Sequence, residues 1–301
     1  MITQKSSTIP PHPSPYWLGR ESSESKRLSE QHEVLIKAAG GYFPTQLSLN
    51  LEKLEAILDV GTGNAQWLLG LRQSGLLSPS VELCGIDVSN DMIPNSKLIR
   101  EFGLTIKIKD LSSPLPINWI KKFDYIHIRH VLIWIEPKNW PCILQNLTNA
   151  LKPGGTLLII YPGAVPYDSK TDKPLGLNTA PGKLFSAFLK HTASCGLPRH
   201  AVTTLPKILL QVGLDPSWIL NTTKPINMGG AEPDLRLRSA SAHHLDFLLK
   251  LLKNLSYSKN LGCPPSDDEK GWKQLAQEWH CAIDRGCYYN LHILSTRKPL
   301  N

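Results

Sequence analysis

The sequence predicts an α/β fold, in which a mostly parallel sheet carries helices on both faces. The clearest sign is the segment Ile57–Gln73, where an apolar run meets an acid and a Gly-x-Gly turn before a helical pattern begins. Further apolar runs of strand length follow, separated by stretches long enough for crossover helices. Strands that alternate with helices form a parallel sheet, because each crossover returns the chain to the same edge.

The expected strands follow one another in a regular order. The first leads into the glycine turn, and the fifth follows a helix end and a Pro-Gly-Gly turn at residues 153–155. In chain order, the seven strands are expected at Ile57–Val60, Val81–Asp87, Thr105–Lys109, Phe123–Ile128, Thr156–Ile160, Gly213–Leu220 and Tyr288–Thr296. A helix at Leu205–Val212 precedes the sixth of them.

The chain divides into three expected regions. Residues 1–15 are rich in Ser, Thr and Pro and are expected to form a disordered tail. Residues 16–48 are expected to form an N-terminal helical cap, with a helix from Ser22 to Ala39 that stops at two glycines. Residues 49–301 make up the main domain, with a helical insertion at about 223–285 that is expected to lie over the carboxyl edge of the sheet as a lid.

The glycine turn predicts where a cofactor binds. A turn built from Gly61 and Gly63 has no Cβ atoms in the way, and open α/β sheets bind ligands at the carboxyl ends of their strands. A dinucleotide fingerprint needs a third glycine where Gln66 stands, which argues against an NAD-dependent oxidoreductase. Asp87, at the tip of the second strand, is well placed to accept hydrogen bonds from two ribose hydroxyls.

Composition narrows the classes of function. The net charge of +8 is spread along the chain with no block of five or six basic residues, so we expect no nucleic-acid partner. No apolar run approaches the length of a membrane span, and the first residues lack the apolar core of a secretory signal. The six cysteines are scattered without a C-x-x-C pair, so we expect no metal site and a reducing, cytoplasmic location.

The motifs together resemble those of class I methyltransferases that use S-adenosyl-L-methionine (SAM). Residues 59–63 match the D-x-G-x-G motif of that family, and residues 151–160, LKPGG followed by a strand, match another of its signatures. The pattern of residues 16–32, GIDVS at 85–89 and FDYIHIR at 123–129 are similar to fungal methyltransferases of secondary metabolism. That group includes enzymes that N-methylate epipolythiodioxopiperazines of the gliotoxin type. The resemblance thins out in the last third of the chain.

The resemblance implies a Rossmann-like fold with a seven-stranded sheet, an N-terminal helical lid and SAM as cofactor. The implied cofactor-binding residues are Asp59, Gly61, Thr62, Gly63, Asp87, Val88, Asp110, Leu111 and Arg129. In the family, the acid at the position of Asp110 takes the adenine amino group, and the next residue backs the ring. Arg129 has two open interpretations, because its guanidinium could hold the N-terminal cap in place or bind a carboxylate.

The N-terminal cap is expected to close over SAM and the substrate. The residues with this expected role are Tyr16, Arg20, Gln31 and His32. The chain departs from the family after the fifth strand, where many relatives have an acid and this sequence has Tyr161-Pro162-Gly163. The role of that acid toward a substrate therefore does not carry over to these residues.

The expected activity is transfer of a methyl group from SAM to N or O of a small secondary metabolite, such as a diketopiperazine or a related peptide or polyketide product. A sulfonium methyl is already activated, so an enzyme mainly has to align the reactants and exclude water. A base is needed only if the nucleophile must lose a proton, and His127 and His130 are the catalytic candidates, with His32 as a third. Strand alternation also allows His127 to hydrogen-bond within the core.

The alternative function is a methyltransferase-like regulator of secondary metabolism that acts through protein partners. Such a regulator should expose a large apolar patch and need not keep a substrate cavity.

Overall fold

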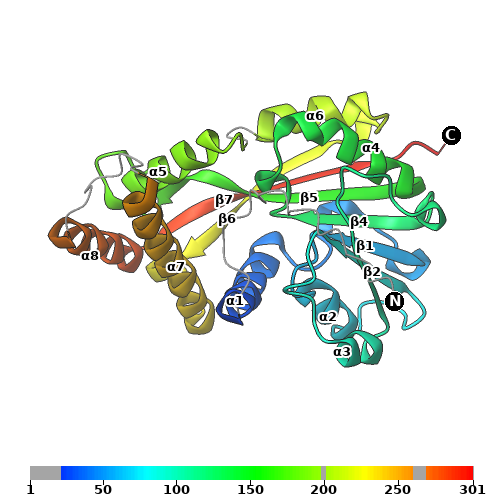
Figure 1. The fold of residues 1–301 in the computed structure, drawn as a ribbon, viewed down its shortest axis with the longest axis horizontal. Helices are drawn as coiled ribbons and strands as arrows, with labels where there is room; N and C mark the ends of the chain where they lie inside the picture. The colour runs from blue at the N-terminus through cyan, green and yellow to red at the C-terminus, as the bar shows by residue number, and fades with distance from the viewer. Residues whose placement is uncertain (1–21, 198–200, 260–268, 301) are drawn as a thin grey trace, which may run out of the picture.

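The computed structural model describes residues 22–197, 201–259 and 269–300. These residues contain a seven-stranded sheet in the order β3-β2-β1-β4-β5-β7-β6 (Figure 1). The strands are β1 Ala56–Val60, β2 Glu82–Asp87, β3 Leu104–Ile108, β4 Phe123–Arg129, β5 Leu151–Asp168, β6 Leu220–Met228 and β7 Cys287–Arg297. The first five strands pair in parallel, and β7 runs antiparallel to its neighbours β5 and β6. The prediction of a mostly parallel, seven-stranded α/β fold is confirmed.

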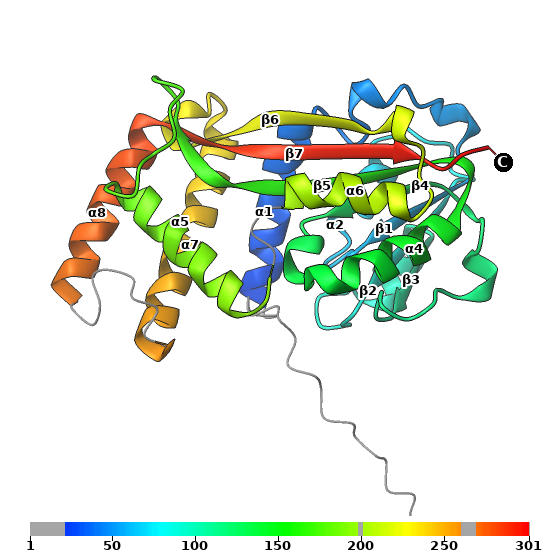
Figure 2. The same ribbon diagram turned by 90° about the horizontal axis from the view of Figure 1, so that it is seen from above.

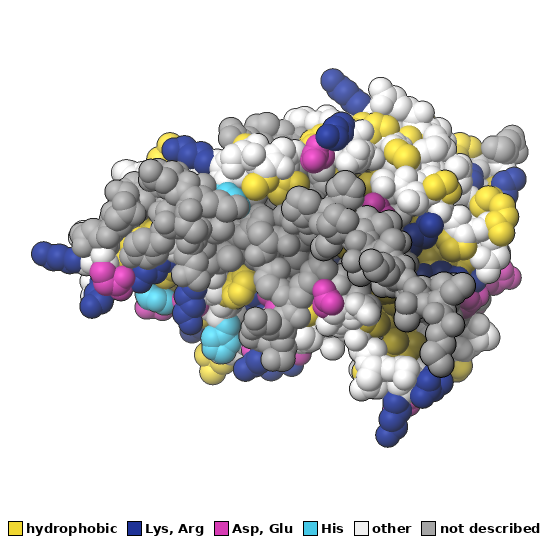
Figure 3. Space-filling model, viewed as in Figure 1, with side chains coloured by type: hydrophobic (Ala, Val, Ile, Leu, Met, Phe, Trp, Pro, Cys, Tyr) yellow, Lys and Arg dark blue, Asp and Glu magenta, His cyan; other side chains and the backbone are white. Residues whose placement is uncertain are grey.

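Helices lie on both faces of the sheet (Figures 1 and 2). They are α1 Ser22–Ala39, α2 Gln66–Gln73, α3 Ser96–Glu101, α4 Trp140–Ala150, α5 Ala180–Ser194, α6 Ala201–Gln211, α7 Leu235–Lys259 and α8 Glu269–Arg285. None of the helices in the described ranges combines the length and the apolar character that crossing a membrane requires. Lys and Arg side chains are scattered over the face shown in Figure 3 rather than gathered in one patch.

Two hydrophobic cores form because neighbouring residues of a strand point to opposite faces of the sheet. Ile57 of β1 joins the core that includes buried side chains of α1, α2, α5, α7 and α8. The next residue, Leu58, joins the core that includes α4 and α6. The same alternation separates Tyr125 from Ile126 in β4. The cap helix α1 is therefore part of the main core, and its Val34 and Leu35 are buried there.

The sixth strand is not where the sequence predicted it. Residues 216–218 form a single 3₁₀ turn, capped by the Asp215 side chain, which accepts a hydrogen bond from Ser217 N at 2.9 Å. The strand itself, β6, follows at Leu220–Met228 and pairs only with β7 among the described strands. It is an edge strand with mostly polar, exposed residues and a proline, so it lacks the apolar run on which the prediction relied.

The last third of the chain also differs from the expectation in its helices. β6 extends to Met228, so the helical part of the expected insertion begins later and consists of α7 and α8. A further helix, α5, lies between β5 and α6 and was not predicted. Beyond the parallel strands, β5, β6 and β7 continue toward α5, α7 and α8, which form a second group of helices (Figures 1 and 2).

The glycine turn after β1 has a backbone that requires glycine. Gly61 and Gly63 both have positive φ angles, 68° and 53°. The amides of Gly61 and Thr62 donate to the carbonyl oxygen of Ile86 in the neighbouring strand at 2.8 and 3.1 Å. A Cβ on Gly61 would overlap the Val131 side chain. Space and backbone conformation therefore both exclude a side chain at Gly61.

A pair of substitutions separates these two constraints. Gly75 has the same φ of 68° as Gly61, but a Cβ there would meet nothing within 4 Å. We expect Gly75→Ala to lower the free energy of unfolding by about 1–2 kcal/mol through backbone strain. Gly61→Ala should cost roughly 1–3 kcal/mol more because of the overlap with Val131. Urea denaturation of both variants measures the difference, and equal losses would contradict the steric argument.

Candidate functional site

A cavity of about 1260 Å³ lies at the carboxyl edge of the sheet. We call the part lined by the segments that follow β1, β2, β3 and β4 the near half, and the part lined by α5, α7 and β7 the far half. Helix α1 also lines the cavity. A typical small-molecule pocket has a volume of roughly 300–1,000 Å³. This cavity therefore has room for more than one small ligand.

All nine residues predicted to bind the cofactor line this cavity. They come from the ends of four parallel strands, which the sheet brings to one edge: Asp59, Gly61, Thr62 and Gly63 from β1, Asp87 and Val88 from β2, Asp110 and Leu111 from β3, and Arg129 from β4. The structure thus places them together, and their role in binding stays a prediction.

The carboxylate of Asp59 is held on both sides. His127 Nδ1 lies 2.8 Å from Asp59 Oδ1, and Thr62 Oγ1 donates to Asp59 Oδ2 at 2.8 Å. The imidazole also stacks on Trp67, with ring centroids 4.1 Å apart. This contact follows from sheet register, because Asp59 of β1 lies opposite His127 of β4. The buried acid therefore has a fixed orientation below the glycine turn.

His127 does not reach the cavity, contrary to its candidacy as a base. Its side chain is fully buried and does not line the cavity wall. Burial lowers the pKa of His127, although the hydrogen bond with Asp59 acts in the opposite direction. His127 instead contacts Asp59 within the core, which agrees with the other interpretation.

His130 lies on the cavity wall just after β4. Its backbone is left-handed, with φ 58°, and its amide donates to Ile160 O at 2.9 Å. Its Nε2 atom is buried and has no hydrogen-bond partner among the described residues. Burial, followed by the charge of Arg129, lowers the pKa of His130 well below its usual value. The imidazole is therefore neutral at pH 7.

Asp87 connects the tip of β2 to the glycine turn. Gly63 N donates to Asp87 Oδ2 at 2.9 Å, and Ser89 N donates to Asp87 Oδ1 at 3.1 Å. A carboxylate oxygen can accept more than one hydrogen bond. The two backbone contacts hold the carboxylate in place at the edge of the cavity.

The cap helix α1 contributes to the site in a different way from the one expected. Gln31 lines the cavity, but His32 is buried behind it. Arg129 Nη2 donates to His32 Nδ1 at 3.1 Å. His32, which does not line the cavity, therefore holds the guanidinium group of Arg129, which does. Burial, followed by the charge of Arg129, lowers the pKa of His32 to about 3. The expected roles of Tyr16 and Arg20 fall on residues outside the described ranges.

The sequence motifs did not reveal what fixes α1 to the glycine turn. Asn64, between Gly63 and Ala65, donates its side-chain amide to Ser25 O at 2.9 Å and to Ser29 Oγ at 3.1 Å. Both serines belong to α1. An asparagine within a turn is ordinary in sequence, so only the fold shows that it binds a helix nearly forty residues away.

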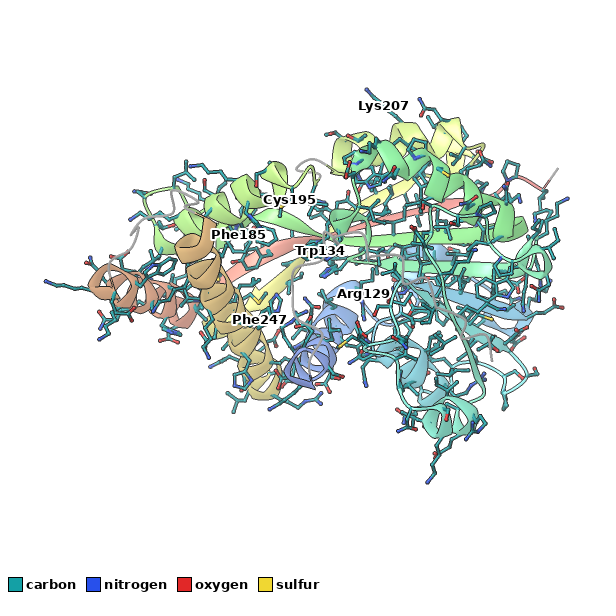
Figure 4. All side chains as sticks on the ribbon, in the orientation of Figure 1. Arg129, Trp134, Phe185, Cys195, Lys207 and Phe247 are labelled. Atoms are coloured by element: carbon teal, nitrogen blue, oxygen red, sulfur yellow. The ribbon has the colours of Figure 1, made fainter. Side chains whose placement is uncertain are left out.

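No sequence motif indicated the far half of the cavity. Phe185 and Phe188 of α5 line it, together with Tyr289 of β7, and the Phe185 ring lies 4.7 Å from that of Tyr289. The hydroxyls of Tyr161 and Tyr289 are buried without hydrogen-bond partners among the described residues. Phe185 and Trp134, which are labelled in Figure 4, both line the cavity. The far half thus combines aromatic rings with unused polar atoms.

The His32 contact predicts that the protein is sensitive to acid. The pKa of His32 is about 3 in the folded chain against an ordinary value of 6.5, so between these pH values the unfolded chain binds a proton that the folded chain rejects. The contribution of His32 to the free energy of unfolding is fully present above pH 6.5. It is lost as the pH falls toward 3, by up to about 1.4 kcal/mol per pH unit.

His32→Asn keeps an acceptor for Arg129 but removes this titration. Urea unfolding at about pH 7 and about pH 5 should therefore show a smaller loss of stability in the variant than in the wild type. An equal loss in both proteins would contradict the assignment of His32.

Comparisons with known proteins identify a family for this chain. Residues 38–192 match a family model described as a methyltransferase domain. The N-methyltransferase verN of Clonostachys rogersoniana is 30% identical over 149 residues, which cover 50% of this chain and 50% of the relative. The N-methyltransferase sirN of Leptosphaeria maculans is 31% identical, over 48% of this chain and 49% of its own. The chain spans about half the length of these curated relatives.

A solved structure shows the same fold. It is a chain in the complex between the Haloferax volcanii Trm112 methyltransferase activator and the putative methyltransferase. The TM-score is 0.50 at 15% identity, over 93% of this chain and 96% of that one. The family match covers more than half of the sequence, from the end of α1 to the end of α5. The chain therefore belongs to the methyltransferase domain family.

Proposed function

We propose that the protein transfers a methyl group from SAM to N or O of a small secondary metabolite. The observation that carries this proposal is the meeting of the Asp59–Gly63 turn and Asp87 on one cavity that has room for two ligands. Membership in the methyltransferase domain family supports it, as does the similarity to fungal N-methyltransferases. The named relatives are all methyltransferases, which gives no support to a regulator without enzyme activity.

The residues of the near half suit each part of SAM. Asp87 would accept hydrogen bonds from the ribose hydroxyls, and Asp110 would accept one from the adenine amino group, with Leu111 against the ring. The two glycines leave the backbone of the turn open to the ligand.

Arg129 can now be given one role in this proposal. Within the described ranges, its side chain is hydrogen-bonded through Nη2 to His32, and the residue faces the cavity. We infer that the remaining N–H groups bind the carboxylate of the methionine part, since guanidinium–carboxylate contacts are charge-assisted. Arg129 then fulfils both interpretations given above. It binds a carboxylate, and its contact with His32 holds the cap helix against β4.

The chemistry asked of the protein is modest. SAM supplies a methyl group that is already activated by the sulfonium charge. The side chains have to hold the nucleophile in line with that methyl group and exclude water, and such orientation is worth several kcal/mol. Where the nucleophile must lose a proton, His130 is the residue we propose as acceptor, since it lines the cavity and His127 does not.

Ligand binding tests the proposed cofactor. Isothermal calorimetry should show binding of SAM and of its demethylated product, S-adenosylhomocysteine, and no binding of NAD. The reason is that Gln66 replaces the third glycine of a dinucleotide site and begins α2. Binding of NAD without SAM would refute the proposal.

Asp87→Ala tests the ribose contact. Two charge-assisted hydrogen bonds are worth roughly 1.5–3 kcal/mol each, so SAM affinity should fall by about a hundredfold or more. The fold should survive, because Asp87 lies at a strand tip and is only partly buried. Asp91→Ala is the matched control, since this acid belongs to the same loop but does not line the cavity. An unchanged dissociation constant for Asp87→Ala would show that the carboxylate only orders the turn.

A further inference from the structure

A buried ion pair within α1 places the guanidinium group of Arg27 next to helix α7. Arg27 donates to both carboxylate oxygens of Glu24, at 2.7 and 2.6 Å. Both side chains are buried, 7% and 2% exposed, so this pair is shielded from water. The guanidinium also lies 5.0 Å from the Phe247 ring of α7, which is labelled in Figure 4. Arg27 is therefore fixed in one orientation at the junction of α1 and α7.

Arg27 also forms a hydrogen bond with His244 of α7. Arg27 Nη1 lies 2.9 Å from His244 Nδ1. An arginine only donates hydrogen bonds, so Nδ1 must be the unprotonated nitrogen of the ring and the proton must sit on Nε2. Burial, followed by the charge of Arg27, lowers the pKa of His244 to about 3. His244 is thus a neutral ring that presents one N–H donor and cannot accept a proton at Nε2.

His244 of α7 belongs to the wall of the cavity. Arg27 and His244 both line the wall, and no described residue bonds to His244 Nε2. The charge of Arg27 contributes to the lowered pKa of His130, which places the Arg27–His244 pair within electrostatic reach of the tip of β4. The aromatic wall of α5 lies on the same cavity, with Phe185 and Phe188.

We propose that His244 is a positioning residue for the methyl acceptor, whose carbonyl oxygen receives a hydrogen bond from Nε2. The inference rests on the proposed function and deepens it, because it assigns one end of the cavity to the acceptor and names a donor there. The acceptor class is a small molecule with an aromatic ring and a carbonyl oxygen, because the α5 wall is aromatic and His244 offers one N–H donor. The ring packs against the α5 wall, and the carbonyl lies against His244.

The test compares variants of His244 that keep an N–H donor with variants that lack it. His244→Gln keeps an N–H at a similar reach, whereas His244→Phe keeps a flat ring without the donor, and His244→Ala is a second variant without it. His243→Phe is the matched control, since this neighbouring histidine has a side chain 57% exposed and does not line the cavity. The probe is the cyclic dipeptide cyclo(L-Phe-Gly), which carries an aromatic ring and two lactam carbonyls.

Two affinities are measured by calorimetry for each protein: that for SAM, and that for the probe with S-adenosylhomocysteine bound. We expect His244→Phe and His244→Ala to bind the probe roughly three- to tenfold more weakly, as loss of one neutral hydrogen bond predicts. His244→Gln should recover most of this loss, His243→Phe should bind as the wild type does, and SAM affinity should be unchanged throughout.

Several outcomes would overturn the inference. Probe affinity that is the same in His244→Phe and the wild type would show that no hydrogen bond is made. Equal losses in the Gln, Phe and Ala variants, or a parallel loss of SAM affinity, would show a structural role only. A wild-type protein that binds SAM but not the probe would exclude the acceptor class. Failure of the wild type to bind SAM would instead refute the proposed function itself, and the SAM measurement separates that case.

Discussion

The buried contact between Asp59 and His127 is the constraint on which the arrangement of the site depends. A carboxylate in a strand that is buried on both faces must be hydrogen-bonded, because an unpaired buried charge is strongly destabilising. Parallel pairing of β1 with β4 supplies His127 on one side of Asp59, and the glycine turn supplies Thr62 on the other. Asp59 therefore links the glycine turn to the central strands β1 and β4. This link also constrains the backbone of Gly61 and Gly63.

The cap helix α1 then joins the two halves of the cavity. It contacts the glycine turn through Asn64, the tip of β4 through the Arg129–His32 pair, and α7 through the Arg27–His244 pair. In both arginine–histidine pairs the guanidinium donates to Nδ1, so each histidine has to be neutral. The helix is thus part of the wall rather than a loose cover, and its apolar residues Val34 and Leu35 share the main core.

The sequence was sufficient to predict the near half of the site because local chemistry marks it. A buried strand, an acid and two glycines leave few alternatives for residues 57–63, and the acids at strand tips follow from the same parallel sheet. The far half carried no such signal. Its walls come from α5, α7 and β7, which meet only in the folded chain, and β6 was misplaced because a polar edge strand has no apolar run. His127 and His130 are three residues apart, and only the fold shows which one reaches the cavity.

The charge balance of the cavity connects stability with chemistry. Two arginines, Arg27 and Arg129, face one cavity, and the histidines beside them have lowered pKa values because burial and positive charge both disfavour protonation. The proposed roles use neutral rings, since His130 would accept a proton and His244 would offer an N–H donor. The same environment penalises the folded state in acid, where the unfolded chain protonates these rings. The acid sensitivity of the fold and the neutral state of these histidines therefore have one cause. Imidazole rings are buried next to two fixed guanidinium groups.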